Sequence, residues 1–179
     1  DSWTNTTGAG VNVIYTVTPL SGTCAGDVFT VSVQVDPEPL GVNDVLGVCS
    51  QSGALGYDLQ VDNITALGNG LASTFQWQAA AHGSVTGETT PPQVSGVIND
   101  NLVNTTLVDQ VVDYTVTPSS GVCTGNSFTV SVTVHPEPVG VALNGVVCSD
   151  AVLGAGFTLT TNGTSVTAAS YNITGITNT

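Results

Sequence analysis

Apolar and polar residues alternate along much of this chain. From Phe29 to Val35 the sequence reads FTVSVQV, so every second residue is apolar and Thr, Ser or Gln lies between. Tyr15 and Val17, in the stretch YTVTP, follow the same spacing. A period of two places apolar side chains on one face of a β-strand. Because the Gly-containing stretch LSGTCAGDV joins these two segments, they are predicted to form a β-hairpin.

The hairpin sequence occurs twice. Residues 15–39 and 114–138 align without gaps, share 18 identical residues of 25, and lie 99 positions apart (114 − 15 = 99). The cysteines at positions 49 and 148 keep the same separation. A period of 99 is too long for a solenoid repeat and suits a domain with its own core. The chain is therefore predicted to be an array of domains with a 99-residue period.

Further strands are predicted at 56–62, at 74–80 and around 94–103, from the same alternation. Their inward-facing residues are expected to be Tyr57, Leu59 and Val61 in the first, and Phe75, Trp77 and Ala79 in the second. No helix is expected, because β-branched residues dominate and Gly or Pro interrupts nearly every window of helical length. Short strands separated by frequent turns predict an all-β fold of tandem β-sandwich domains.

Domain boundaries are predicted where DPEPLGVN and HPEPVGVA follow the last strand of each repeat. Pro-x-Pro removes two backbone donors and favours an extended, fairly stiff connection. The boundaries give the C-terminal part of one domain (1–39), a complete domain (40–138) and the N-terminal part of the next (139–179). Both ends then fall within a repeat, as expected of an excerpt from a longer array.

The charge of the chain excludes several functions. There is no Lys or Arg and there are 13 acidic residues, so the net charge is −13. Nucleic-acid binding would lack its main electrostatic contribution, and an anionic membrane surface would repel the chain. Without lysine, Schiff-base catalysis and amide cross-links are excluded within this segment. No apolar run approaches the roughly 18 residues that span a bilayer, so membrane insertion of this segment is not expected.

The four cysteines are predicted to form disulfides. Cys49 follows soon after the incoming linker, and Cys123 lies in the last hairpin turn. The final strand, about 23 Å long at roughly 3.3 Å per residue, would bring Cys123 to the same pole as Cys49. We therefore predict a Cys49–Cys123 bond, with Cys24 and Cys148 pairing with cysteines outside these residues. Disulfides indicate an extracytoplasmic protein, and the lack of CxxC makes a metal site the weaker interpretation.

No catalytic motif is present, and the acidic residues are scattered, so we do not expect an enzyme. The histidines are His82 and His135, and the counterpart of His135 in the first repeat is Asp36. Asp36, Glu38 and Asp100 are weak calcium candidates, because hard oxygen ligands could gather near domain junctions. The absence of an EF-hand loop argues against calcium, and no other cofactor is expected.

Carbohydrate contact is the remaining chemical interpretation. Trp77 could stack on a sugar, but its alternation with Phe75 and Ala79 places it in the core. Five Asn-x-Ser/Thr sites are formal glycosylation acceptors, although chance matches are expected in so Asn- and Thr-rich a chain. They are Asn5, Asn63, Asn104, Asn162 and Asn172.

The pattern YTVTP…GxCxGxxFTVSVxVxPxP, preceded by INDNLVNTT at 98–106, resembles the PKD-like, immunoglobulin-like repeats of very long cell-surface proteins of Bacteroidota, including gliding-motility adhesins. The resemblance covers the whole chain. It implies a filament exported by the type IX route and attached at the outer membrane, without catalytic residues. One departure is that Tyr114 lies nine residues before Cys123, whereas true immunoglobulin domains place this Tyr two residues before the second Cys.

These observations predict a structural, adhesive segment of a long extracellular surface filament. Its partners would be neighbouring repeats of the same chain, with sister filaments and surface glycans as further candidates. One alternative is an accessory binding-module array of a secreted enzyme. Another is a non-covalent filament whose subunits complete each other's partial domains by strand exchange.

Overall fold

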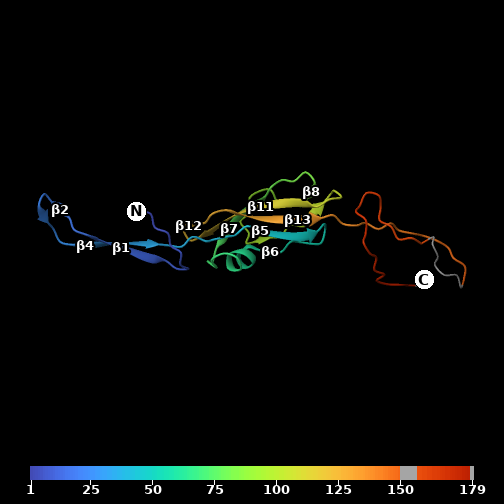
Figure 1. The fold of residues 1–179 in the computed structure, drawn as a ribbon, viewed down its shortest axis with the longest axis horizontal. Helices are drawn as coiled ribbons and strands as arrows, with labels where there is room; N and C mark the ends of the chain where they lie inside the picture. The colour runs from blue at the N-terminus through green and yellow to red at the C-terminus, as the bar shows by residue number, and fades with distance from the viewer. Residues whose placement is uncertain (150–156, 178–179) are drawn as a thin grey trace.

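A computed structural model describes residues 1–149 and 157–177. Its parts follow one another in a row, with a hairpin at one end, a sandwich in the middle and a largely irregular stretch at the other end (Figure 1). We refer to residues 1–39, 40–138 and 139–179 as the N-terminal, middle and C-terminal segments. Among the residues that the structure describes, no helix is long and apolar enough to cross a membrane.

The N-terminal segment folds as the predicted hairpin. Strands β1 (Val11–Val17) and β4 (Phe29–Val35) pair antiparallel, with Tyr15 opposite Val31. Their connection contains the short pair β2 (Leu20–Ser21) and β3 (Cys24–Ala25). The two long strands form a two-stranded sheet of their own, so one apolar face has no second layer over it.

The same hairpin forms the centre of the middle segment. Strands β11 (Gln110–Ser120) and β13 (Phe128–His135) pair with Tyr114 opposite Val130, the register of the first hairpin 99 positions later. Strand β7 (Thr74–Ala79) pairs antiparallel with β11, and β5 (Asp44–Cys49) pairs parallel with β13. The short β12 (Cys123–Thr124) pairs with the end of β11.

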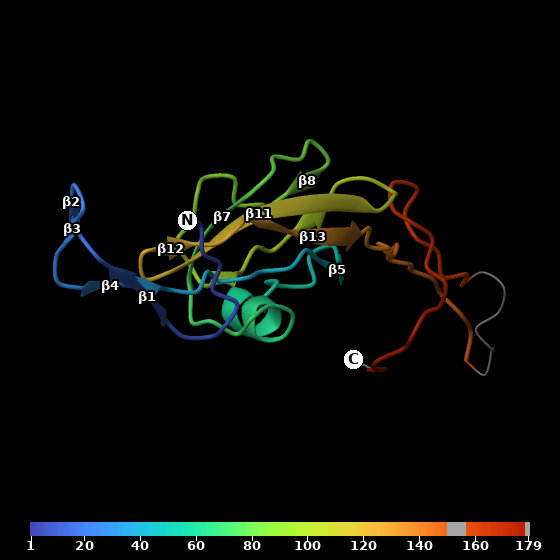
Figure 2. The ribbon, with the colours of Figure 1, turned by 60° about the vertical axis from the view of Figure 1, so that its left-hand side comes forward.

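A second layer covers one face of this sheet. It contains β6 (Tyr57–Asp58) paired with β9 (Val97–Ile98), β8 (Val85–Thr86) paired with β10 (Val103–Asn104), and a π-helical turn, η1 (Leu59–Thr65). In Figure 2 the η1 coil lies below the arrows of β11 and β13. The region around 94–103 therefore forms two short strands instead of one.

The strand predicted at 56–62 is wrong beyond Asp58. The Asp58 carboxylate accepts hydrogen bonds from the backbone N–H groups of Gln60 and Val61, at 2.9 and 3.0 Å, and so caps the start of η1. Capping of this kind turns the chain away from the extended conformation. Val61, expected to point inward, is exposed, and Ile64 is buried instead.

The core of the middle segment draws on both layers, which confirms the all-β sandwich. Trp77 and Tyr114 pack edge to face, with ring centroids 5.8 Å apart. The predicted inward residues Phe75, Trp77 and Ala79 are all buried. The buried apolar set is Tyr57, Leu59, Ile64, Phe75, Trp77, Ala79, Val85, Ile98, Leu102, Val112, Tyr114, Val116, Phe128, Val130, Val132 and Val134.

Candidate functional site

The Pro-Glu-Pro linker is anchored to the middle segment by amide side chains. Asn69 accepts a hydrogen bond from the Leu40 N–H at 3.1 Å and donates to the Glu38 carbonyl at 2.8 Å. Asn63, fully buried, pairs in the same way with the N–H and C=O of Val42, at 3.0 and 2.7 Å. Each amide takes the place of a strand partner for the linker backbone. The linker is therefore bonded to the domain that follows it.

A third asparagine ties the loop before β11 to the end of the last strand. The Asn104 amide donates to the carbonyls of Val134 and Val108, both at 2.8 Å, and its oxygen accepts from the N–H and hydroxyl of Thr106. Asn5 makes the same four contacts with the residues 99 positions earlier. This loop geometry is a repeated structural feature, and its sequence trace is the tripeptide NTT, present at 5–7 and again at 104–106.

These contacts change the interpretation of the glycosylation motifs. The amide nitrogens of Asn5, Asn63 and Asn104 each donate two hydrogen bonds within the fold. Asn63 and Asn104 are also buried, so these two motifs are structural. Asn172 is exposed, and Asn5 and Asn162 are half-buried, so these three are the more accessible motifs.

Asp100, one of the calcium candidates, forms a buried hydrogen-bonded cluster. Its carboxylate accepts from the Tyr114 hydroxyl at 2.8 Å and from the N–H and hydroxyl of Thr89 at 2.7 and 2.6 Å. Burial, reinforced by this carboxylate, raises the pKa of Tyr114 far above its ordinary value. The cluster stabilises the fold by joining the loop before β10 to the centre of the sheet.

Tyr57 forms a similar cluster near the linker. Its hydroxyl donates to the Asp44 carboxylate at 2.8 Å and accepts from the Asn63 amide at 3.2 Å. Burial raises the pKa of Tyr57 well above its ordinary value; the Asn63 hydrogen bond lowers it, and the Asp44 carboxylate raises it further. Both tyrosines therefore remain neutral donors at physiological pH.

The other proposed ligands do not gather around a common point. The Asp36 carboxylate accepts from the Gln34 amide at 2.6 Å. His135 pairs with Asp109 at 2.9 Å on the surface, and His82 accepts from the Ser84 N–H. Within residues 1–149 and 157–177, no group of three or more His, Cys, Asp or Glu side chains could hold a metal ion. The structure gives calcium no binding geometry in this part of the chain.

The cysteines lie where the predicted bond cannot form. Cys49 ends β5 opposite His135, at the outgoing end of the middle segment, because β5 runs parallel to β13. Cys123 lies at the incoming end, with its sulfur 3.9 Å from the Asp36 carbonyl oxygen. The Cys49–Cys123 pairing within one domain does not fit this arrangement, and all four cysteines are free thiols in the structure. The prediction did not include β5, which carries Cys49 from the incoming to the outgoing end of the sheet.

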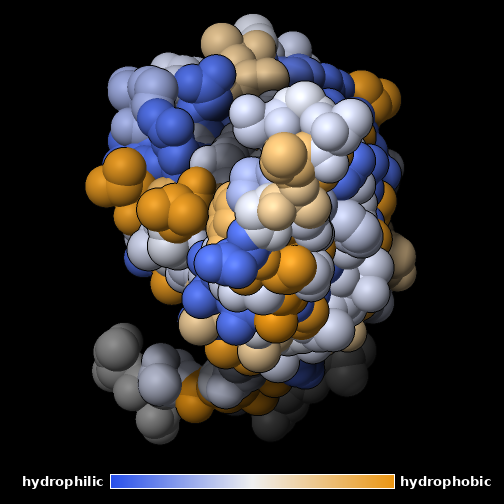
Figure 3. Space-filling model, turned by 90° about the vertical axis from the view of Figure 1, so that its left-hand side faces the viewer, coloured by the Kyte–Doolittle hydropathy of each residue, from blue (hydrophilic) through white to orange (hydrophobic). Residues whose placement is uncertain are grey.

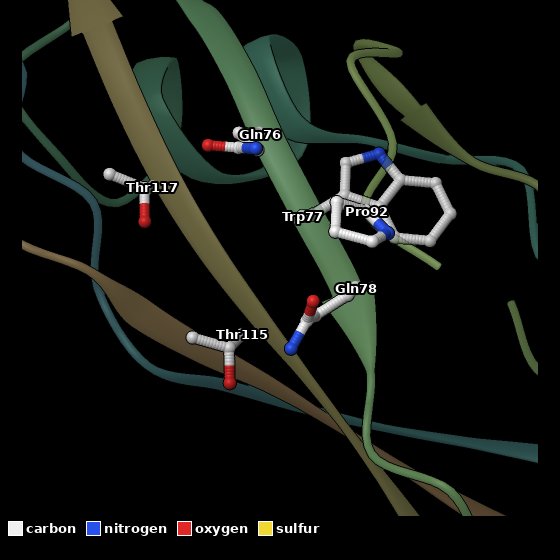
Figure 4. A pocket seen from close by; sticks show the side chains of 6 residues that line it. All are labelled: Gln76, Trp77, Gln78, Pro92, Thr115 and Thr117. Carbon is white, nitrogen blue, oxygen red and sulfur yellow. The ribbon is translucent and has the colours of Figure 1, made fainter. Parts of the chain in front are cut away.

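The depression around Trp77 has a polar lining. Its volume is about 250 Å³, and Gln76 and Gln78 of β7 lie beside Thr115 and Thr117 of β11 on the outer face of the sheet (Figure 4). Trp77 itself is only 4% exposed, and its indole N–H donates to the Ser95 carbonyl at 2.9 Å. The prediction that Trp77 belongs to the core is therefore confirmed, and its ring offers no stacking face to a sugar.

The apolar face of the N-terminal hairpin is the largest contrast to the well-filled middle segment. Phe29, Val31 and Val33 of β4, together with Val11 of β1, are exposed there. Figure 3 views this end of the molecule and shows apolar side chains at its surface among polar ones. Exposed apolar faces of this kind mark surfaces that normally contact another segment.

The family model of the PKD-like domain matches residues 1–39 and 47–138. The chain belongs to the PKD-like domain family. No curated protein matches the chain. PKD-like domains are typically extracellular, with adhesive or structural roles. Both copies of the hairpin, and the loops anchored by Asn5 and Asn104, lie within the residues that the PKD-like model matches.

Proposed function

We propose that this chain is a structural, adhesive segment of a long extracellular surface filament built from tandem PKD-like domains. The domain boundaries are 1–39, 40–138 and 139–179, and the role is mechanical instead of catalytic. One observation carries the proposal: two hairpins 99 residues apart have the same strand register and the same asparagine-anchored loop. Repetition of this kind suits a spacer, because every domain then forms the same junction with the domain before it and the domain after it.

The topology of the middle segment suits a load-bearing role. Strand β5 begins directly after the incoming linker, and β13 ends at the outgoing linker. The two strands pair in parallel from Asp44 opposite Val130 to Cys49 opposite His135. Force applied to the two linkers therefore pulls the strands past each other and loads all hydrogen bonds of the ladder together. Ladders loaded in this way resist more force than ladders opened one bond at a time.

Load also reaches the domain through the linker. Pro37 and Pro39 are buried at the junction, and Asn63 and Asn69 hold the linker backbone. A linker bonded at several points transmits tension to the following domain without a flexible spacer. The resemblance to Bacteroidota surface adhesins extends this proposal to type IX export, attachment at the outer membrane and a place in gliding motility, with sister filaments and surface glycans as partners.

Electron microscopy of the native material tests the proposal. We expect long beaded threads with one bead per repeat, spaced by roughly 35–40 Å for a domain of this size with its linker. Short isolated particles with a larger head would overturn the filament and favour a module array attached to a secreted enzyme. The mass under denaturing conditions separates one long covalent chain from a polymer of short subunits.

A further inference from the structure

Strand β5 forms an open edge of the main sheet in the middle segment. Among the residues that the structure describes, β5 pairs with β13 and with no strand on its other side. The N–H of Ser50, directly after β5, donates to the His135 carbonyl of β13 at 2.8 Å. Because backbone groups alternate in direction along a strand, those of Val45, Gly47 and Cys49 point away from β13.

Two of the six backbone groups on this edge are bonded within the domain. The Val45 N–H donates to the Asp44 carboxylate at 2.8 Å, and the Cys49 carbonyl accepts from the Ser52 N–H at 3.2 Å. The other four groups have no hydrogen-bond partner within residues 1–149 and 157–177. They are the carbonyl of Val45, the N–H and carbonyl of Gly47, and the N–H of Cys49. All three residues are exposed, so these groups face solvent.

The four free groups are complementary to the same four groups of a second copy. In an antiparallel pair, opposite residues exchange two N–H···O bonds, and the next such pair lies two residues along each strand. When Gly47 lies opposite Gly47 of the second copy, the two glycines exchange two bonds. The Cys49 N–H of each copy then meets the Val45 carbonyl of the other copy. This pairing uses every free group, and it leaves aside the two groups that are already bonded.

The side chains of β5 allow two strands to approach closely. Gly47, at the centre of the pairing, has no side chain that could hold the backbones apart. On the outer face, Val45 of one copy lies beside Cys49 of the other, and both are uncharged. On the inner face, Leu46 of one copy lies opposite Val48 of the other, and both residues pack against the core. Cross-strand apolar pairs of this kind stabilise a sheet.

The charge distribution also favours contact at this edge. The chain has a net charge of −13, but residues 45–57 contain no charged side chain. Asp44 lies opposite Ser50 of the second copy, so the two Asp44 positions are six residues, or about 20 Å, apart along the strands. That separation exceeds the Debye length of about 8 Å at physiological ionic strength, so their repulsion is screened. Exposed edges are commonly protected from pairing by Lys or Pro, and β5 contains neither.

We propose that two copies of this chain pair side by side through β5, in antiparallel orientation, with Gly47 on the twofold axis. The same surface is used by both copies, so the contact closes as a dimer. Every strand stays in its own domain. The inference does not depend on the proposed filament; within such a filament, the contact would join two threads that run in opposite directions. The counterpart of Gly47 is Val146, so the proposal concerns the middle segment alone.

Amide hydrogen exchange of the reduced, ¹⁵N-labelled chain tests the backbone pairing. The contact is small, so we expect a dissociation constant of roughly 0.1 mM. The N–H groups of Gly47 and Cys49 should therefore exchange several-fold more slowly in a concentrated sample, at about ten times that constant, than in a dilute one. The N–H of Val94, beside the opposite edge of the sheet, should exchange equally fast in both. Exchange at Gly47 and Cys49 that is independent of concentration would contradict the pairing.

Disulfide trapping tests the register. In a chain whose other three cysteines are replaced by serine, Val45→Cys places a thiol opposite Cys49 of the second copy. The two positions lie about 13 Å apart within one strand, too far for a bond inside one copy. Oxidised glutathione takes up two electrons and two protons from each thiol pair and leaves as two glutathione thiols. We expect a product of twice 18.0 kDa on non-reducing gels, joined between positions 45 and 49.

Val94→Cys in the same serine background is the matched control for trapping. Val94 is 84% exposed and Val45 is 73% exposed, so both thiols are accessible to chance collisions. The control chain should form much less dimer than the Val45→Cys chain under the same conditions. Equal dimer yields from the two chains would show that the trapped product arises from collision, and the proposed register would be rejected.

A charge placed on the edge tests the docking without disulfides. Val45→Asp adds a carboxylate beside the paired backbones and should weaken dimerisation at least tenfold in sedimentation equilibrium. Val94→Asp adds the same charge at the opposite edge and should leave dimerisation unchanged. Both residues are exposed, so urea unfolding of the middle segment should match that of the parent chain. A parent chain that stays monomeric, or a Val45→Asp chain that associates as strongly as the parent, overturns the proposal.

Discussion

The two hairpins, β1–β4 and β11–β13, share most of their sequence and all of their register, yet their surroundings differ. Val31 is 42% exposed, while its counterpart Val130 is fully buried. Strand pairing is therefore a property of the hairpin sequence itself, since it forms with or without a second layer. Burial is contributed by other segments, above all by η1, β7 and the short strands. The two hairpins therefore show that strand pairing depends on local sequence, whereas a buried core depends on the segments that cover the sheet.

The linkers show the same contrast. Pro39 is buried because the loop of Gly125 packs against its carbonyl, whereas Pro138 is exposed. The counterpart of Gly125 is Gly26, at the far end of the chain. The Pro39 junction therefore packs against the hairpin turn of the domain that follows it. The differences between counterparts can be tested by making the same substitution in each member of a pair.

The largest effect is expected from a charge placed in the sandwich core. Val132→Asp buries a carboxylate among apolar residues and should destabilise the middle segment by more than about 4 kcal/mol, which is enough to unfold it. Val33→Asp, the same change in the other hairpin, should leave the urea unfolding midpoint of the middle segment unchanged. Circular dichroism in urea measures both. Equal effects at the two positions would show that the hairpins are not distinguished by their covering layers.

A smaller effect is expected at the paired glycines. Gly41→Ala introduces a Cβ that clashes with the ring of Phe128 and should cost about 1–3 kcal/mol in the free energy of unfolding. Gly140→Ala meets no atom in the structure and should change the stability by less than about 0.5 kcal/mol. Thermal unfolding of both variants gives the comparison. A neutral Gly41→Ala would mean that Phe128 moves without cost.

The paired aspartates give the next comparison. Asp100 accepts three hydrogen bonds in a buried site, whereas its counterpart Asp1 is exposed and accepts from Tyr15 at a longer 3.3 Å. Asp100→Asn replaces one acceptor oxygen by a donor and should cost about 2 kcal/mol. Asp1→Asn should have no measurable effect on unfolding in denaturant. If Asp100→Asn were equally silent, the cluster would not stabilise the sandwich.

Some of this structure could be predicted because it is local. The alternation of FTVSVTV and the Gly-containing turn determine the hairpins, and the alternation around Trp77 places that ring in the core. What could not be predicted depends on contacts between distant residues. The parallel pairing of β5 with β13 leaves no periodic trace in so short a strand, and this pairing decides where Cys49 lies. Capping of η1 by Asp58 likewise overrides an alternating pattern.

The smallest effect is a pH dependence that follows from the buried tyrosines. The pKa of Tyr114 is raised in the folded state by burial and by the Asp100 carboxylate, while an unfolded tyrosine ionises near pH 10. The folded state therefore holds its proton after the unfolded state has lost it, so stability is full below about pH 10. It should fall by up to about 1.4 kcal/mol per pH unit above that value, for each such tyrosine.

Tyr114→Phe separates this contribution from general alkaline denaturation. The variant loses the hydrogen bond to Asp100 and should be less stable at pH 7, yet its stability should decline less steeply between pH 10 and 11.5, because Tyr57 alone then contributes. Urea unfolding across that range measures the slope. The exposed hairpin supplies the control. Tyr15→Phe removes a surface hydroxyl outside the middle segment, so the variant's stability should decline with pH as steeply as that of the parent chain. Equal slopes for all three chains would show that the Tyr114 hydroxyl does not link proton binding to folding.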